Sequence, residues 1–260
     1  MRNISTAFLI AVFAVSGIAL VALFGPTQML AQEREGDGTQ SGLTPAQVET
    51  IVRDYLMDNP EILLEMQSRL EEKQQEERMA MARSEITAAS DQIFNSDADG
   101  VIGNPDGDVT IVEFFDYNCG YCRRALDDME RLIENDENLR FVLKEFPILG
   151  PESQEAHLVS MAVRNIAPDQ YETFHQRLLG SDGRADEEAA IAVARELGVD
   201  ESALRDEMQN PEIARTINNT YELANRLQIT GTPSYIVGDE LVFGAVGRAQ
   251  LAEKIQEARQ

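Results

Sequence analysis

The pattern of hydrophobic and polar positions separates the chain into stretches with different periodicities. The first is an apolar run of 18 residues, Ala7 to Phe24, which contains no charged residue and is followed by Gly25-Pro26. A run of this kind behind a basic residue, here Arg2, is typical of a secretory signal or of an N-terminal membrane anchor. Residues 1–32 are therefore expected to direct the rest of the chain across a membrane, and both cleavage and retention as an anchor stay open.

Two short amphipathic helices are predicted after a polar linker at residues 33–42. Capping residues mark both starts, with proline in the first helical turn: Thr44, Pro45 and Gln47 for the first helix, and Asn59 and Pro60 for the second. Apolar residues recur at helical spacing as far as Leu70, where the polar run 71–78 begins. Because this run separates the apolar stripes from the rest of the chain, we favour burial against further copies over burial against the chain's own core. Residues 43–95 are therefore predicted to form a helical oligomerisation or stalk segment.

The remaining residues, 96–260, combine strand and helix patterns, which predicts an α/β domain. Residues 108–115 are rich in β-branched and aromatic side chains and predict a strand. Residues 229–237 predict a turn into another strand, with Pro233 at its entrance. Between them, residues 152–228 carry helical patterns separated by turns. These helices are expected at residues 156–164, 170–179, 187–197 and 211–227.

The two cysteines of the chain, Cys119 and Cys122, lie where the first strand is followed by a helix. Free N–H groups and the dipole at a helix N-terminus stabilise a thiolate, so the pKa of Cys119 is expected to fall to about 3.5–7.5. Cys122 follows one helical turn later and can close or resolve a disulfide. Redox catalysis is favoured over a static disulfide, because such a small loop gains little entropy. Binding of Cu(I) between the two thiolates is the chemical alternative.

Composition and charge exclude several other functions. The net charge of −24, from 46 acidic and 22 basic residues, would repel a phosphate backbone, so no nucleic-acid partner is expected. Two cysteines are too few for a disulfide scaffold or a four-thiolate zinc site. His157 and His175, about 27 Å apart if they lie on one helix, cannot share a metal, and we predict no metal and no cofactor. The acidic charge is expected on outer helices around an uncharged substrate groove.

Two motifs together resemble the active site of the thioredoxin superfamily: Cys119-Gly120-Tyr121-Cys122, and Thr232-Pro233 before the last predicted strand. The closer resemblance is to the DsbA-like branch. It also rests on Glu113-Phe114-Phe115, on the segment Val142 to Gly150, and on the helical insertion. The resemblance implies a thioredoxin-like α/β fold with a helical insertion over residues 96–260, in which Pro233 is a cis-proline that faces the cysteines.

The same resemblance implies roles for single residues. It makes Cys119 the nucleophile and Cys122 the resolving thiol. Gly120, Tyr121, Thr232 and Pro233 would contact the substrate. Glu113 lies six residues before Cys119, where the family has a buried acid that transfers protons, and Lys144 is expected as its partner on the next strand. An ordinary exposed ion pair between Glu113 and Lys144 is the alternative.

The helical segment before this domain carries a resemblance of its own. Tyr55 to Leu63, followed by a run rich in Gln, Glu and Lys, is similar to the N-terminal domain of the suppressor-of-copper-sensitivity protein C family. In that family the segment joins protomers, in several members as a trimer. A homo-oligomer of this chain, with a trimer as the implied number, is therefore expected.

The resemblances imply an exported, periplasmic or otherwise extracytoplasmic, thiol–disulfide exchange enzyme. Gly120-Tyr121 between the cysteines, with Thr232 before the proline, resembles disulfide isomerases of the DsbC type, so an isomerase or reductase is favoured. A DsbA-type oxidase is the first alternative, a copper-handling protein the second, and a scaffold with a relic redox site the third. The implied partners are cysteine-containing exported proteins and a membrane redox partner that resets the cysteine pair.

Overall fold

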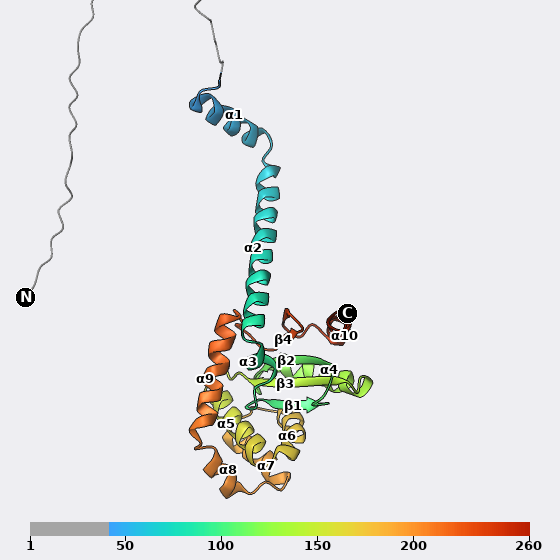
Figure 1. Ribbon diagram of the computed structural model, residues 1–260. Helices are drawn as coiled ribbons and strands as arrows, with labels where there is room; N and C mark the ends of the chain where they lie inside the picture. The colour runs from blue at the N-terminus through green and yellow to red at the C-terminus, as the bar shows by residue number, and fades with distance from the viewer. Residues whose placement is uncertain (1–41) are drawn as a thin grey trace, which may run out of the picture. The chain divides into compact units, whose positions relative to one another are not determined.

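The structure is a computed structural model that describes residues 42–260 (Figure 1). The signal or anchor predicted at residues 1–32 lies outside the described residues, as does the linker at 33–42 apart from its last residue. Within the described part of the chain, no helix has the length and apolar character needed to cross a membrane. The chain divides into two compact units between Asp58 and Asn59.

Helix α1, Pro45–Asp58, belongs to the first unit and begins with the predicted capping box. The backbone N–H of Thr44 donates to Gln47 Oε1 at 2.9 Å, and the backbone N–H of Gln47 donates to Thr44 Oγ1 at 3.3 Å. Several apolar side chains of α1 are 42–53% exposed, namely Val48, Ile51, Val52 and Leu56. The capping box is confirmed, and the helix presents an exposed apolar face.

Helix α2, Glu61–Ala88, opens the second unit and is 28 residues long. The polar run 71–78 lies inside this helix, because Glu, Lys, Gln and Arg all have high helix propensity. The last turns of α2 pack on the rest of the unit. Ile86 is 3% exposed, and Arg83 forms ion pairs with Asp239 and Glu240 at the start of strand β5, Glu240–Phe243.

A five-stranded sheet with the order β1-β3-β2-β4-β5 forms the centre of the second unit. Its other strands are β1 Gly100–Gly103, β2 Val109–Phe115, β3 Leu139–Glu145 and β4 Ser234–Val237. Strands β2 and β3 are parallel, and the other neighbouring pairs are antiparallel. The strand predicted at 108–115 and the one predicted to begin at Pro233 are confirmed, and so is the α/β class.

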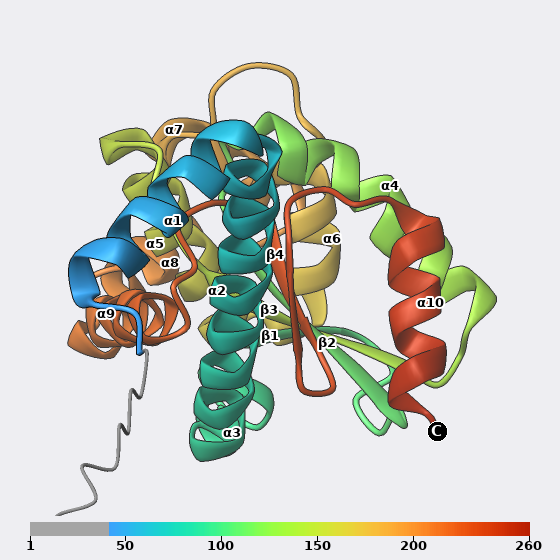
Figure 2. The same ribbon diagram turned by 90° about the horizontal axis from the view of Figure 1, so that it is seen from above.

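Helices cover both faces of this sheet, and alternation along the strands divides the side chains between two cores. Ile111 and Phe115 belong to the core that includes α4 and α10, whereas Val112 and Phe114 belong to the core formed with α3 and α9. The bounds of these helices are α3 Ser90–Phe94, α4 Gly120–Asn135, α9 Pro211–Arg226 and α10 Arg248–Ala258. Figure 2 shows α4 and α10 side by side on one face of the sheet.

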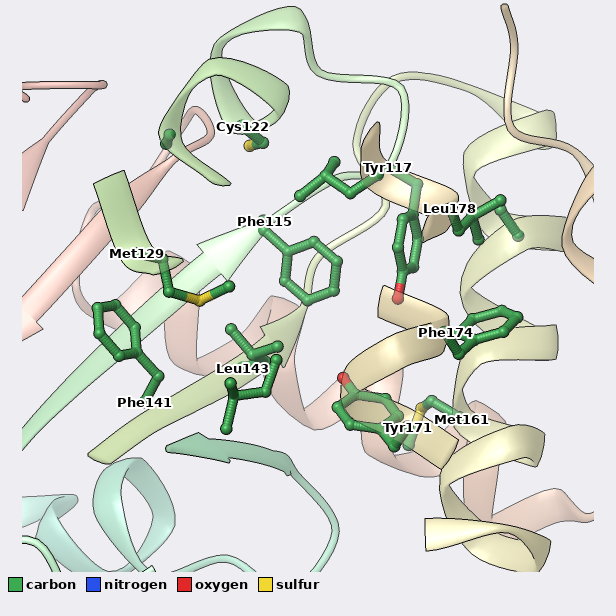
Figure 3. Packing of buried hydrophobic residues seen from close by; sticks show 14 of the residues in the cluster. Phe115, Tyr117, Cys122, Met129, Phe141, Leu143, Met161, Tyr171, Phe174 and Leu178 are labelled. Carbon is green, nitrogen blue, oxygen red and sulfur yellow. The ribbon is translucent and has the colours of Figure 1, made fainter. Parts of the chain in front are cut away.

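The helical insertion lies between β3 and β4, as predicted, and ends with α9. Its other helices are α5 Pro151–Ile166, α6 Pro168–Gly180, α7 Glu187–Glu196 and α8 Glu201–Glu207. The sequence pattern did not predict α8, a helix of seven residues capped by Asp200. Tyr171 and Phe174 of α6 enter the same core as Phe115 (Figure 3). The insertion therefore packs beside the end of β2, where the cysteine motif begins.

Candidate active site

The cysteine pair lies at the N-terminus of α4, immediately after β2. Cys119 is the N-cap residue and Cys122 is in the first turn, and both are free thiols. Cys119 is 6% exposed and Cys122 is fully buried, whereas Gly120 and Tyr121 between them are exposed. Gly120 and Tyr121 are therefore open to solvent, and of the two cysteines only Cys119 keeps a small accessible surface.

The two thiols have opposite acidities. The hydrogen bond from the Cys122 thiol is the largest cause of the shift in the pKa of Cys119. With contacts to Thr232 and to the N–H groups of Cys122 and Tyr121, it lowers the pKa of Cys119 to about 5, although burial opposes the shift. Burial raises the pKa of Cys122 far above its usual range, and the hydrogen bond to Cys119 adds to this. At neutral pH the site holds a thiolate at Cys119 and a thiol at Cys122.

The loop before β4 lies opposite Cys119. Because β2 and β4 are antiparallel with Phe114 opposite Ser234, the residues that follow β2 meet those that precede β4. The Thr232–Pro233 peptide bond is cis. The Cys119 thiol, when protonated, donates to the carbonyl oxygen of Thr232, which lies 3.2 Å from Cys119 Sγ. The two sequence motifs, more than a hundred residues apart in the chain, thus form one site.

Glu113 is buried on the same face of the sheet as the cysteines. Burial raises the pKa of Glu113 to about 8, against the hydrogen bond with Tyr235, its neighbour across the β2–β4 pair. A negative charge on Cys119 raises it further, and a charge on Glu113 in turn raises the pKa of Cys122. The carboxyl group is therefore coupled to both cysteines and is mostly protonated at neutral pH.

Lys144 is not the partner of Glu113, and the predicted pairing is wrong. Lys144 lies opposite Phe114 in the β2–β3 register, so its side chain emerges on the other face of the sheet from Glu113. There it forms a buried ion pair with Asp99 and donates to the carbonyl of Gln92. An exposed ion pair between the two is excluded as well, because Glu113 and Lys144 are only 4% and 2% exposed.

Two residues that sequence reasoning missed hold the loop in front of Cys119. The Asp116 carboxylate accepts from Ser153 Oγ and from the backbone N–H groups of Ile148 and Leu149, at 2.8–3.0 Å. Asn118 exchanges two hydrogen bonds of 2.8 Å with the backbone of Ala185, between α6 and α7. Asp116 could have been found from its sequence position, since a lone acid directly after a buried strand needs strong local partners.

Charged side chains flank this site. A groove of about 480 Å³ beside Gly120 is lined by Arg123, Arg184 and Glu152 among others. Arg124 stacks on the exposed ring of Tyr121, with the guanidinium carbon 4.3 Å from the ring centroid. The groove beside Gly120 is therefore charged, and the uncharged substrate groove stays a prediction.

A reactive thiolate, a protonated thiol one turn later and a cis-proline against the first sulfur define a thiol–disulfide oxidoreductase of the thioredoxin-like fold. The sequence profile of the DSBA-like thioredoxin domain matches residues 110–256, and the chain belongs to this family. The profile of the copper resistance protein ScsC N-terminal domain matches residues 46–77, within α1 and α2.

Solved structures with the same fold include a thioredoxin-like oxidoreductase from Silicibacter pomeroyi DSS-3. It is 44% identical, with 65% of this chain and 96% of that chain covered and a TM-score of 0.62. The thiol-disulfide exchange protein alpha-DsbA2 from Wolbachia pipientis is 31% identical over 69% and 97%, with a TM-score of 0.65. A linker-deletion mutant of Proteus mirabilis ScsC is 28% identical over 85% and 99%, with a TM-score of 0.65.

Curated relatives match about three fifths of the chain at lower identity. Disulfide bond formation protein D of Bacillus subtilis is 24% identical over 169 residues, which cover 60% of this chain and 75% of that protein. Na(+)/H(+) antiporter NhaA 1 of Salinispora arenicola is 25% identical over 166 residues. The chain spans only 25% of the length of that relative, so the match concerns one part of the antiporter.

Proposed function

We propose that the chain is an exported disulfide isomerase or reductase that acts on cysteine-containing substrate proteins through Cys119. The observation that carries this proposal is the division of acidity within the pair. At neutral pH Cys119 is ready to attack a disulfide, and Cys122 keeps its proton until a later step.

In the proposed first step, the Cys119 thiolate attacks one sulfur of a substrate disulfide. A mixed disulfide forms as the substrate S–S bond breaks, and the second substrate sulfur leaves as a thiolate. Thr232 and Pro233 contact the substrate strand, and the exposed Gly120 and Tyr121 lie beside it. If the freed substrate thiolate attacks the mixed disulfide, the substrate is isomerised and the Cys119 thiolate returns.

Reduction requires the proton of Cys122 to leave, and the proposed acceptor is the ionised carboxylate of Glu113, which is the minor form at neutral pH. The charge on Cys119 is one cause of the raised pKa of Glu113. That charge disappears when Cys119 enters the mixed disulfide, so the carboxylate becomes easier to form at the moment when Cys122 needs a base. Cys122 then attacks Cys119 Sγ, the substrate leaves reduced, and the pair becomes a disulfide that a membrane redox partner must reduce.

A second candidate function is that of a DsbA-type oxidase. The observation that favours it is the same low pKa of Cys119, because a stabilised thiolate favours the reduced pair and makes its disulfide more oxidising. The steps above then run in reverse, and the partner reoxidises the pair. Copper handling has less support, since Cu(I) prefers thiolates and burial keeps Cys122 protonated.

The proposed oligomer rests on the helices before the catalytic domain. Besides the apolar face of α1, the first half of α2 exposes four large apolar side chains at 55–71%: Leu63, Leu64, Met66 and Leu70. Exposed apolar surface at regular helical spacing is typical of helices that pack on further copies. We propose residues 43–95 as the oligomerisation or stalk segment, with a trimer as the family resemblance implies, and residues 96–260 as the catalytic domain. Several active sites near one substrate would favour isomerisation.

Refolding of a scrambled multi-disulfide protein tests the proposed function. The reduced wild-type chain should restore substrate activity catalytically, and Cys119→Ala should not. If Cys119→Ala matches the wild type, the enzymatic function is wrong. If the oxidised chain refolds a fully reduced substrate rapidly but the reduced chain leaves the scrambled one unchanged, the oxidase is correct. Thiol-dependent binding of Cu(I) in the absence of either activity would identify the copper-handling function.

A further inference from the structure

A group of buried polar side chains connects the helical insertion to the loop in front of Cys119. Its members are Tyr117, Glu145, His157, Ser160, Tyr171 and His175, each at most 3% exposed. Figure 3 shows Tyr117 and Tyr171 with their hydroxyl groups inside the core between the sheet and the insertion. Both histidines of the chain, His157 and His175, are therefore buried in this group.

The hydrogen bonds of His157 fix its protonation. The backbone N–H of Tyr117 donates to His157 Nε2 at 3.3 Å, so this nitrogen carries no proton. The proton of the neutral ring must therefore be on Nδ1, which contacts Glu145 Oε2. A protonated Glu145 donating to Nδ1 is excluded, because the imidazole would then have to carry its proton on Nε2. His157 thus donates to a Glu145 carboxylate and accepts from Tyr117.

The remaining bonds of the group follow in one direction. Ser160 Oγ donates to Glu145 Oε1 at 2.7 Å, and Tyr171 OH donates to the same oxygen at 3.1 Å. Since the Ser160 proton is used, Tyr117 OH must donate to Ser160 Oγ, at 2.7 Å, and it accepts from His175 Nδ1 at 3.2 Å. Each bond thus has a single donor, and the carboxylate of Glu145 receives three of them.

This order agrees with the acidities of the surrounding groups. Burial raises the pKa of Tyr117 and of Tyr171 well above the usual range, and Glu145 adds to both shifts. Burial lowers the pKa of His175 to about 3, and any positive charge on His157 would lower it further, so the His175 ring stays neutral. Charged groups outside this group include Asp99 with its partners Lys144 and Arg164, since Asp99 interacts with Glu145. The group therefore contains one anion, the Glu145 carboxylate, which accepts three hydrogen bonds from protein donors.

We propose that His157 is a positioning residue, which ties the backbone of the Cys119 loop to the buried carboxylate of Glu145 so that the helical insertion sets the reactivity of the cysteine pair. Tyr117 precedes Cys119 by two residues, and the neighbouring Asp116 and Asn118 are held by other partners. His157 is the insertion side chain that accepts the N–H of Tyr117 itself. It also packs on the Tyr117 ring, with 4.8 Å between ring centroids.

If the hydrogen bond from Tyr117 to His157 is lost, the loop before Cys119 can shift and change the geometry of the hydrogen bonds to the Cys119 sulfur. The thiolate depends on the N–H groups of Tyr121 and Cys122 and on the Cys122 thiol, all of which must point at one sulfur. A displacement of the loop weakens these bonds together. A variant that loses the Tyr117–His157 hydrogen bond should therefore raise the pKa of Cys119, whereas a variant that only destabilises the fold should not.

His157→Asn separates the two contacts of the imidazole. An asparagine amide reaches the place of Nδ1, so it can still donate to Glu145, but it is too short to accept from Tyr117. The reduced full chain is titrated by its ultraviolet thiolate absorbance. The pKa of Cys119 should rise by about half a unit or more, which is about a threefold loss of thiolate below the pKa. Val159→Ala, a buried change on the same helix, is the matched control: it should lower the melting temperature and leave the titration unchanged.

A wild-type titration in folded His157→Asn would overturn the proposal, as would an equal shift in Val159→Ala. If His157→Asn does not fold, His157→Gln decides, because its longer side chain can still accept from Tyr117. It should titrate as the wild type does, and a raised pKa of Cys119 would refute the tether. The role of His157 rests on the proposed function, but the titration can be carried out without any exchange activity. A chain that fails to act on scrambled substrate can therefore still pass this test.

Discussion

The hydrogen bond from the Cys122 thiol is the largest cause of the low pKa of Cys119, so its removal should change the chemistry of the site. Cys122→Ala deletes the donor and keeps the helix. A hydrogen bond to a charged group contributes about 1.5–3 kcal/mol, which corresponds to about one to two pKa units. The pKa of Cys119 should therefore rise from about 5 to roughly 6–7.

Alkylation by iodoacetamide as a function of pH measures this shift, because the thiolate is the reacting form. At pH values below the wild-type pKa, Cys122→Ala should react about 10- to 100-fold more slowly than a variant that keeps a donor. Cys122→Ser is that variant, since its hydroxyl can still donate to Cys119. If alanine and serine at this position give the same titration, or if alanine leaves the pKa near 5, the hydrogen bond is not the main cause.

Three further outcomes follow from the buried charges and from the exposed helices. Burial raises the pKa of Glu113 from 4.5 to about 8, so its ionisation costs stability increasingly as the pH rises through this window and no further above it. Glu113→Gln should therefore raise the free energy of unfolding by about 3 kcal/mol near neutral pH and by little near pH 4; a gain independent of pH in denaturant titrations would contradict this cause. Lys144→Met should lower the free energy of unfolding by about 3–5 kcal/mol, because it leaves the buried Asp99 without its ion-pair partner. The titration of Cys119 should not change, because the pair lies on the other face of the sheet. The double variant Lys144→Met, Asp99→Leu should recover most of the loss, and no recovery would mean that the pair is not the cause. In sedimentation, residues 42–260 should form an oligomer and residues 96–260 a monomer, and a monomer in both would refute the oligomerisation segment.

Local patterns in the sequence were sufficient for the parts of the site that depend on single elements. A run of β-branched residues followed by two cysteines one turn apart places Cys119 at a helix N-terminus, whatever the rest of the fold does. The cis geometry at Pro233 was different. Only the family resemblance suggested it, because most bonds before proline are trans.

The predicted pairing of Glu113 with Lys144 was wrong because the two side chains lie on opposite faces of the sheet. The resemblance supplied two strands but no register between them, and a shift of one residue moves a side chain to the other face of the sheet. The partner, Asp99, lies in a turn before β1 and has no periodic signal. Asp99 was therefore not a candidate in any pattern of strands and helices.

The network around Glu145 is a further property that no local pattern contains. It joins β3, α5, α6 and the cysteine loop, and histidine or serine within a helical pattern looks the same whether it faces solvent or a buried carboxylate. Helix α8 was missed because seven residues give too little periodicity, and its Asp200 cap is a single residue. The full length of helix α2 was not predicted, because its polar run carries no apolar stripe, although the residues of that run favour a helix.

The attack of Cys119 on a substrate disulfide is tested by capture of the mixed disulfide that it forms. Cys122→Ser keeps the donor to Cys119 and removes the resolving sulfur, so the adduct should persist. The reduced variant is mixed with a scrambled multi-disulfide protein, and the products are analysed by mass spectrometry without reductant. We expect a covalent adduct of chain and substrate linked through Cys119, and none when Cys119→Ala is combined with Cys122→Ser. If Cys119 reacts with a small disulfide reagent but forms no adduct with the protein substrate, the proposed function is contradicted.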